Sequence, residues 1–301
     1  MERINTRRTA LKKLALGTTG MLAFSNCSSA ANPQEKEKVD EASAEISLKG
    51  KVNHSVCRWC YGKIPLEAFC EGAQDIGIKS IELTGPEEWP ILKKYGLTCA
   101  LANAPWVSLT EGFNNPANHE KLYKSYVELI DQAADAGLQQ VIVFSGNRNG
   151  LSDEAGLENC AVGLDKVAKH AQKRNITVTM ELLNSKVNHP DYQGDRTSWG
   201  AALVDKLGAD NFKLLYDIYH MQIMEGDIIA TIKKYKDYIS HYHTGGVPGR
   251  NEIDETQELY YPAILQAIVD TGFNGFVAQE FIPKRDDKLG SLRQGVEICD
   301  V

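Results

Sequence analysis

Four residues of the types that bind divalent cations each close a short apolar or β-prone run of this 301-residue chain. They are Glu181, Asp217, His243 and Glu280, and successive members are 36, 26 and 37 residues apart. One strand with its crossover helix takes upwards of about 30 residues, so the spacing predicts four consecutive strand-helix units. Parallel strands deliver their last residues to one edge of a sheet, and we therefore expect the four side chains to meet.

Three carboxylates would repel one another in a buried site unless a cation neutralised them. Hard oxygen donors with a single imidazole suit Mg²⁺ or Mn²⁺ better than they suit a structural zinc ion. A cation held there would bind both oxygens of an α-hydroxycarbonyl compound and acidify its C–H bond, while one carboxylate removes the proton and another returns it. These residues therefore predict isomerisation or epimerisation of a small carbonyl or sugar-like substrate.

Two more polar residues follow the same strands. His220 comes three residues after Asp217, where it would hydrogen-bond a substrate oxygen; the alternative is a loop histidine satisfied within the protein. Arg250 follows the run that ends near His243 and would clamp a substrate carboxylate through its forked guanidinium. The alternative for Arg250 is an ion pair with Glu252 or Asp254.

The elements that would position these residues alternate regularly from about residue 52 onward. Strands are expected at 53–58, 79–83, 97–103, 140–145, 176–181, 212–217, 239–244 and 275–280. Helices are expected at 65–77, 87–95, before 136, and at 152–174, 198–207, 224–235, 259–271 and 286–298. Eight such units without a break in composition predict one α/β domain at 51–301, a closed (β/α)8 TIM barrel. The long loops at 104–116, 183–197 and 245–256 would be its lids.

The N-terminus resembles an export signal. Arg7 and Arg8 precede a short apolar run that ends at Phe24, which predicts a twin-arginine-like signal peptide at 1–26 and a periplasmic protein. A general secretory route is the alternative. Cys27 sits in a sequence similar to a lipobox, so a lipid anchor there is the one expected link to a membrane. Residues 27–50, rich in Ala, Ser, Glu and Lys, predict a flexible tether.

Motifs around the four candidate ligands resemble those of hydroxypyruvate isomerases in the xylose isomerase-like barrel superfamily. The segments that carry the resemblance are 180–186, 216–222, 241–243 with 248–250, and 279–281. The resemblance implies a divalent cation on Glu181, Asp217, His243 and Glu280, with Glu181 and Glu280 as the proton-transfer pair. It also implies substrate contacts from His220, Arg250 and Asn184. His243 is a departure, because hydroxypyruvate isomerases commonly carry Gln there and ketose 3-epimerases carry His.

The net charge and the composition of the chain exclude some classes of function. A formal net charge of −7 and a lack of basic stripes exclude a nucleic-acid partner, and seven histidines are too few for a zinc-dependent barrel nuclease. The leading hypothesis is a metal-dependent isomerase that converts hydroxypyruvate or a related compound through an enediolate. A ketose 3-epimerase or another sugar-modifying lyase with the same centre is the second, and an exported carbohydrate-binding lipoprotein is the third. Homo-oligomerisation stays open.

Overall fold

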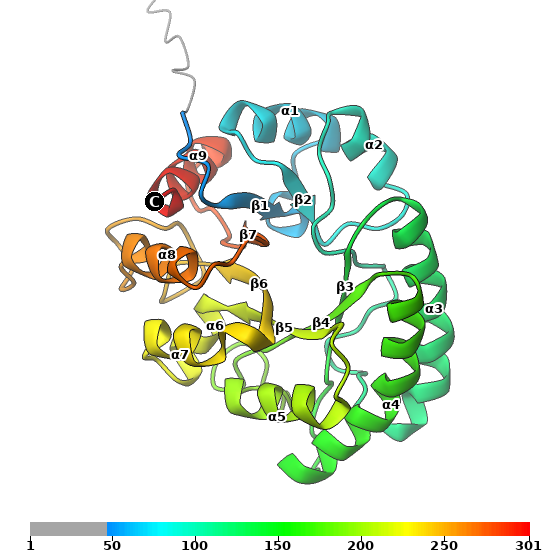
Figure 1. Ribbon diagram of the computed structural model, residues 1–301. Coiled ribbons are helices and arrows are strands. Elements are labelled where there is room, and N and C mark those ends of the chain that lie inside the picture. The colour runs from blue at the N-terminus through cyan, green and yellow to red at the C-terminus, as the bar shows by residue number, and fades with distance from the viewer. Residues whose placement is uncertain (1–46) are drawn as a thin grey trace, which may run out of the picture. The chain divides into compact units, whose positions relative to one another are not determined.

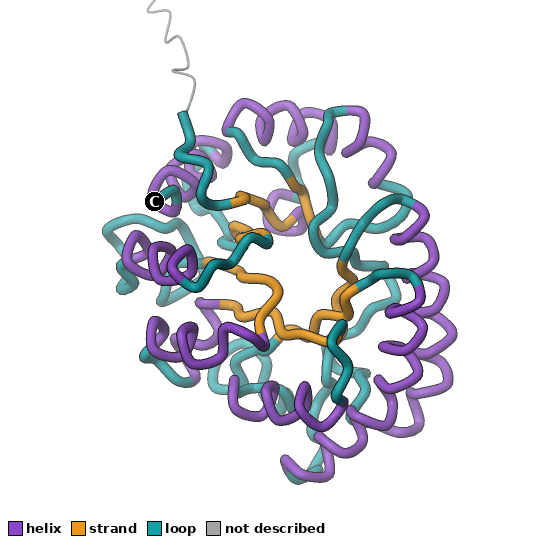
Figure 2. Tube along the Cα trace, in the orientation of Figure 1, coloured by secondary structure: helices purple, strands orange, loops and turns teal. Residues whose placement is uncertain are grey.

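The structure, a computed structural model, describes residues 47–301 of the chain. In this part, parallel strands form one curled sheet that helices surround (Figures 1 and 2). The strands are β1 (Asn53–Cys57), β2 (Ser80–Glu82), β3 (Gln140–Val143), β4 (Thr177–Glu181), β5 (Phe212–Asp217), β6 (Ile239–Thr244) and β7 (Phe276–Gln279). Their order in the sheet is β2-β1-β7-β6-β5-β4-β3, so the predicted α/β class and parallel barrel-like sheet are confirmed.

The strand predicted at 97–103 is wrong as a regular strand. This segment lies between the two edge strands and forms only isolated bridges, from Thr98 to Ser80 and from Ala102 to Val141. The Ala100 amide donates to the Ser80 hydroxyl at 2.8 Å instead of to a backbone carbonyl, and this side-chain bond interrupts the ladder. The expected eight-stranded barrel is therefore a seven-stranded sheet whose remaining gap an irregular segment fills.

Helices cover the outside of the sheet in Figure 1. They are α1 (Leu66–Ile76), α2 (Trp89–Lys94), α3 (His119–Asp135), α4 (Asp153–Lys173), α5 (Thr197–Leu207), α6 (Ile218–Met224), α7 (Ile228–Tyr235), α8 (Tyr261–Asp270) and α9 (Lys288–Cys299). Helix α1 shows why they form, since Phe69, Ala73 and Ile76 recur at helical spacing and are buried. Gly77 ends this helix with φ 86°, a left-handed conformation that glycine adopts without strain.

The helix predicted at 224–235 is α7, and a further helix that was not predicted, α6, precedes it. Helix α6 begins directly after β5 because the Asp217 carboxylate accepts the backbone N–H groups of Tyr219 and His220, at 2.7 and 3.3 Å. An aspartate at this position satisfies amides that would otherwise lack partners at the start of a helix. The remaining helices and strands agree with the predicted ranges to within a few residues.

The apolar side chains of β3 and β5 alternate between two clusters. Val141 and Leu214 belong to the large cluster that the helices share, whereas Ile142 and Leu215 belong to a second cluster inside the sheet. Asp217 lies two residues beyond Leu215 and therefore points in the same direction. The strand period thus turns the last side chain of β5 toward the interior.

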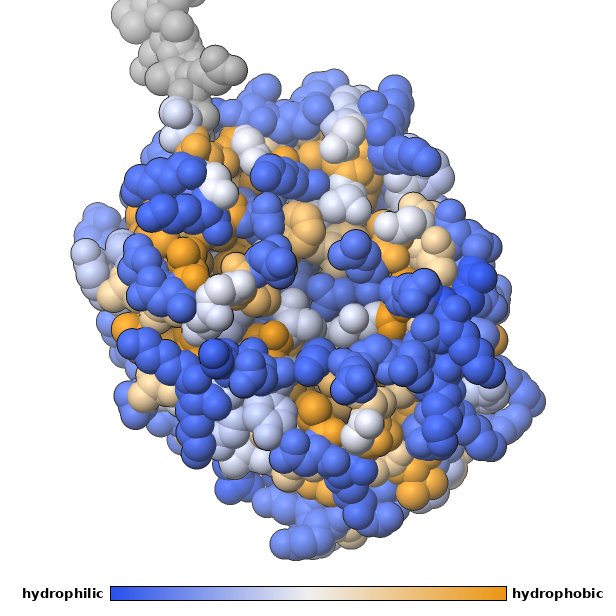
Figure 3. All heavy atoms as spheres, viewed as in Figure 1, coloured by the Kyte–Doolittle hydropathy of each residue, from blue (hydrophilic) through white to orange (hydrophobic). Residues whose placement is uncertain are grey.

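Residues 1–46 lie outside the described part, so the export signal, the lipid anchor at Cys27 and most of the tether stay predictions. Lys49 is already bound to the barrel, because its backbone N–H and its Nζ donate to the side chain and carbonyl of Asp300 at 2.6 and 2.9 Å. Over residues 47–301, no helix has the length and apolar character needed to cross a membrane. On the face drawn in Figure 3, apolar side chains form small groups between hydrophilic ones.

Candidate active site

The four residues proposed as ligands, Glu181, Asp217, His243 and Glu280, come together where the strands end. Each offers one donor atom, and these atoms all lie within 4.8 Å of one another. All four side chains are buried. Glu181 and Asp217 are the last residues of β4 and β5, and Asp217 pairs in register with His243 of β6. Glu280 follows β7 directly.

Arg250 brings a positive charge to this cluster. Its Nη2 atom donates to Asp217 Oδ2 at 3.0 Å and to Glu280 Oε2 at 2.5 Å. Its guanidinium carbon lies 5.3 Å from the ring centres of both Trp59 and Tyr219. The guanidinium is therefore held between two aromatic faces and aimed at two carboxylates.

The pKa values of the two glutamates are shifted in opposite directions. Burial, and then the charge of Glu280, raise the pKa of Glu181, whose Oε1 atom is buried without a hydrogen-bond partner. Against the effect of burial, Arg250 and His243 hold the pKa of Glu280 well below its usual range. Burial raises the pKa of Asp217 to about 7 in spite of Arg250. Glu280 is thus the more acidic of the two glutamates and Glu181 the more basic.

This donor set fits a divalent cation. The unpartnered, buried Oε1 of Glu181 is an atom that a bound ion would satisfy. Three carboxylates facing one guanidinium leave negative charge in a buried place, which a cation would offset. Oxygen donors with one imidazole suit Mg²⁺ or Mn²⁺. The residues that would hold it are Glu181, Asp217, Glu280 and, through Nδ1, His243.

A fifth polar residue, Glu82, was missed by the sequence analysis. His243 Nδ1 faces the cluster, 2.5 Å from Glu280 Oε2 and 3.7 Å from Glu181 Oε1. Its other nitrogen, Nε2, lies 2.8 Å from Oε1 of Glu82, the last residue of β2. The sequence does indicate Glu82, because Ser80-Ile81-Glu82 is another β-prone run that ends in a carboxylate.

His220 and Asn184 lie beside the cluster and contact each other. The Asn184 backbone and side-chain N–H groups lie 3.2 and 2.7 Å from His220 Nδ1, so Nδ1 accepts and Nε2 carries the proton. Nε2 is 3.5 Å from Asp217 Oδ2, and burial lowers the pKa of His220 well below its usual value. The Asn184 carbonyl oxygen accepts the backbone N–H groups of Val187 and Asn188. Both residues therefore organise the loop after β4, and substrate contact by either stays a prediction.

A recess of about 420 Å³ opens beside the two glutamates. Its lining joins Glu181, Glu280 and Arg250 to apolar side chains that follow several different strands. The lining residues are Trp59, Leu83, Asn103, Val107, Leu109, Phe144, Glu181, Leu183, His189, Arg250 and Glu280. Trp59 and His189 were not predicted from the sequence, and the Trp59 indole donates to Glu280 Oε1 at 2.7 Å. The recess gives a small molecule a place next to the proton-transfer candidates.

Residues 70–299 match the family model described as the xylose isomerase-like TIM barrel. The chain belongs to this family. The 2-oxo-tetronate isomerase of Cupriavidus necator is 29% identical over 75% of this chain and 90% of its own length. The hydroxypyruvate isomerase of Escherichia coli is 27% identical over 76% of this chain and 93% of its own length. These relatives confirm the predicted resemblance and the prediction of an isomerase-like enzyme.

Among solved structures, 3-keto-D-glucoside 4-epimerase from Escherichia coli superposes with a TM-score of 0.69. That structure is 15% identical and is matched over 82% of this chain and 98% of its own chain. At this identity the likeness concerns the fold alone. The xylose isomerase-like barrel thus extends over nearly all of the described chain.

Proposed function

We propose that this xylose isomerase-like barrel is a divalent-metal-dependent isomerase or epimerase that acts on a small α-hydroxycarbonyl compound through an enediolate. The observation that carries the proposal is the meeting of Glu181 and Glu280 with Asp217 and His243 beside one recess, with donor atoms that all lie within 4.8 Å of one another. The pKa values of the two glutamates are also shifted in opposite directions. Two carboxyl groups with opposed pKa shifts are typical of an acid and a base that work together. A protein that only binds sugars needs no such pair.

In this proposal Glu181, Asp217, His243 and Glu280 hold Mg²⁺ or Mn²⁺. When bound, such an ion supplies positive charge that makes the substrate C–H bond more acidic. The ionised Glu280 carboxylate takes the proton from the carbon that bears the hydroxyl group, and the electron pair moves toward the carbonyl oxygen. Arg250 and the Trp59 indole, both bound to Glu280, hold its carboxylate in place for this transfer.

The site of proton return separates the two candidate reactions. In an isomerisation, protonated Glu181 gives its proton to the neighbouring carbon, and the hydroxyl proton of the first carbon passes to the former carbonyl oxygen as the new carbonyl group forms. In an epimerisation, Glu181 gives its proton to the opposite face of the same carbon and the original carbonyl group forms again. Afterwards Glu280 is protonated and Glu181 is ionised, so exchange with water resets the pair. Isomerisation is the reaction named for the two sequence relatives, hydroxypyruvate isomerase and 2-oxo-tetronate isomerase, and it is our first candidate.

Epimerisation of a larger sugar is the second candidate, because the recess exceeds what a three-carbon acid would fill. Its volume of about 420 Å³ falls within the range of sites for larger organic ligands. Leu83, Val107, Leu109, Phe144 and Leu183 give it an apolar wall. His243 also stands where the ketose 3-epimerases that the motifs resemble carry His.

The test is hydrogen exchange in D₂O, followed by ¹H NMR, with purified protein and Mg²⁺. The substrates are hydroxypyruvate, four-carbon 2-oxo acids, ketoses and oxidised sugars. We expect at least one compound to lose its α-proton signal, and the product to carry deuterium on the neighbouring carbon for an isomerase or on the same carbon for an epimerase. The Glu280→Gln protein is the control. Exchange at the same rate in that variant would contradict the proposed mechanism.

A further inference from the structure

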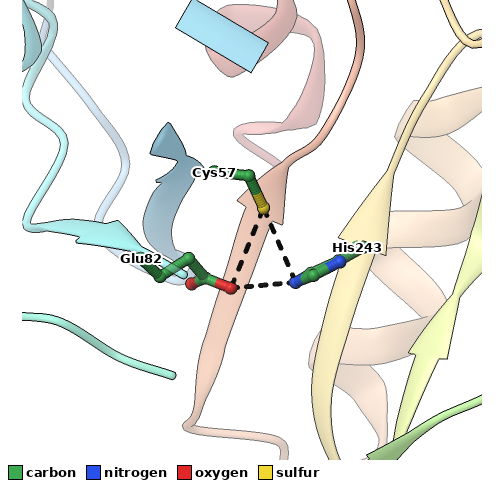
Figure 4. A group of neighbouring side chains, drawn as sticks. All are labelled: Cys57, Glu82 and His243. Atoms are coloured by element: carbon green, nitrogen blue, oxygen red, sulfur yellow. Dashed lines mark hydrogen bonds and ion pairs between the residues drawn. The ribbon is translucent and has the colours of Figure 1, made fainter. Parts of the chain in front are cut away.

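Figure 4 shows the Glu82 carboxylate and the Cys57 thiol beside a ring nitrogen of His243. This nitrogen is Nε2, whereas the Nδ1 atom of the same ring faces the proposed metal centre. The Glu82 Oε1 atom is 2.8 Å from His243 Nε2 and 2.8 Å from His241 Nε2. Its Oε2 atom accepts the Ser55 hydroxyl at 2.6 Å. The thiol of Cys57 lies 4.0 Å from Oε1, the limit of a sulfur hydrogen bond. All of these side chains are completely buried.

The ionised carboxylate determines which nitrogen of His243 carries a proton. An ionised carboxylate only accepts hydrogen bonds, so both imidazoles must present Nε2–H to it. Each Nε2 atom lies 2.8 Å from the same carboxylate oxygen, a distance at which a protonated ring nitrogen donates a hydrogen bond to it. When a cation replaces the 2.5 Å contact between His243 Nδ1 and Glu280, a neutral His243 with its proton on Nε2 offers the lone pair of Nδ1 to that cation. That lone pair is what a divalent cation requires of an imidazole.

A contribution to stability alone explains the cluster of Glu82, His241 and His243 poorly. His241 Nδ1 is buried and has no hydrogen-bond partner, and a buried polar group left unpaired costs about 1–3 kcal/mol. The described contacts of the Glu82 carboxylate are two imidazoles, a hydroxyl and a thiol, without a lysine or arginine. Apolar side chains would fill the same interior at lower cost. The cluster is explained better by a need to hold the His243 ring in one orientation.

We infer that Glu82 is a positioning residue that fixes His243 in the tautomer with Nδ1 open toward the cluster, and that His241 steadies Glu82 through the same oxygen. This inference rests on the proposed metal centre. Carboxylates that hold the second nitrogen of a metal-bound histidine raise its basicity and fix its ring, and their loss typically costs about 10–100-fold in metal affinity.

The first test compares Mn²⁺ affinity in wild type and Glu82→Gln, measured by electron paramagnetic resonance of the free ion. A glutamine keeps the size but removes the negative charge, and its amide can turn an N–H donor toward Nε2, so His243 is no longer held in one tautomer. We expect Mn²⁺ to bind roughly 10–100-fold more weakly. The matched control is Glu252→Gln, a buried carboxylate that accepts the backbone N–H groups of Lys284 and Arg285 and lies outside the four ligands. Its Mn²⁺ affinity should be unchanged.

The second test reads the tautomer directly and needs no variant of Glu82 to fold. Long-range ¹H–¹⁵N correlation spectra of protein with ¹⁵N-labelled histidine and Mg²⁺ should show His243 with a proton on Nε2 alone, assigned by comparison with His243→Gln. A proton on Nδ1 instead would overturn the inference. Equal Mn²⁺ affinity in wild type and folded Glu82→Gln would overturn it as well. Wild-type protein that binds no Mn²⁺ would contradict the proposed metal centre itself.

Discussion

Arg250 donates to Asp217 at 3.0 Å from a position between the rings of Trp59 and Tyr219. The same Nη2 atom reaches Glu280, so one cationic side chain holds two of the four proposed ligands. A divalent cation would offset the same negative charge. Arg250 and the ion would therefore both stabilise the cluster by offsetting its negative charge. The stability of the protein should depend more on the ion when the arginine is removed.

We expect Arg250→Gln to lower the free energy of unfolding of the metal-free protein by about 3–5 kcal/mol, because it leaves buried carboxylates without their partner. Mg²⁺ should restore more of the stability of this variant than it adds to wild type. Urea unfolding with and without Mg²⁺ measures both effects. Arg285→Gln is the control, since that half-exposed side chain pairs with Asp254 and should cost only about 0–1 kcal/mol. An identical Mg²⁺ effect in wild type and Arg250→Gln would refute the prediction.

Glu280→Gln and Glu181→Gln should each slow α-proton exchange by about 10²–10⁴-fold while some metal binding remains, because an amide cannot carry the proton. The double variant should be little slower than either single one if both residues serve one sequence of proton transfer. Asp217→Asn should mainly weaken metal affinity, since it removes a charge but keeps an oxygen donor. Exchange rates in D₂O and Mn²⁺ titrations separate these effects. Wild-type exchange in both single variants would contradict the two-glutamate mechanism.

His54 should make the protein less stable in mild acid. Burial lowers the pKa of this histidine below 6.5, in spite of Asp300, whose Oδ1 lies 3.5 Å from Nε2. The unfolded chain therefore takes up the proton first, so the stability that neutral His54 contributes is complete above about pH 6.5 and is lost as the pH falls through the folded-state pKa. Urea unfolding between pH 8 and pH 5 should show a shallower acid loss in His54→Gln than in wild type. His170→Gln controls for the general cost of replacing a histidine, and parallel curves for wild type and His54→Gln would disprove the role.

A larger side chain at Val107 should separate the two candidate substrate classes. Val107→Trp places an indole in the recess, which would exclude a sugar-sized substrate but leave room for a three-carbon acid beside the glutamates. If the substrate is a larger sugar, kcat/KM should fall roughly ten-fold or more, with metal affinity unchanged. Val162→Trp is the matched control, because Val162 is 61% exposed on α4. Unchanged kcat/KM in Val107→Trp would favour the three-carbon substrate.

The predicted export signal can be tested without the barrel chemistry. Replacing Arg7 and Arg8 together by lysine keeps the positive charge but removes the twin arginine, so twin-arginine export of the full chain should stop. The measurement is the size and the cell fraction of the protein in a bacterial host. Replacing Lys12 and Lys13 by arginine is the control and should leave export intact. Unchanged processing of the Arg7 and Arg8 variant would point to the general secretory route.

The sequence alone was enough to predict the parallel α/β architecture and the meeting of Glu181, Asp217, His243 and Glu280. The reason is local, because each strand of a parallel sheet places its last residue at the same edge and the strand period decides which way it points. The ranges of β5 and β6 could be predicted to the residue, since both are short apolar or β-prone runs bounded by polar residues.

Only the tertiary structure decided which further side chains contact these four residues. Glu82 and His243 lie on β2 and β6, which are not neighbours in the sheet, and they meet only because the sheet curls and brings their inward side chains together. Ser80 is a second example. Its hydroxyl accepts the backbone N–H of Ala100, so this segment forms isolated bridges and no regular strand. Such contacts depend on side chains from strands far apart in the chain, and no spacing or period within one segment records them.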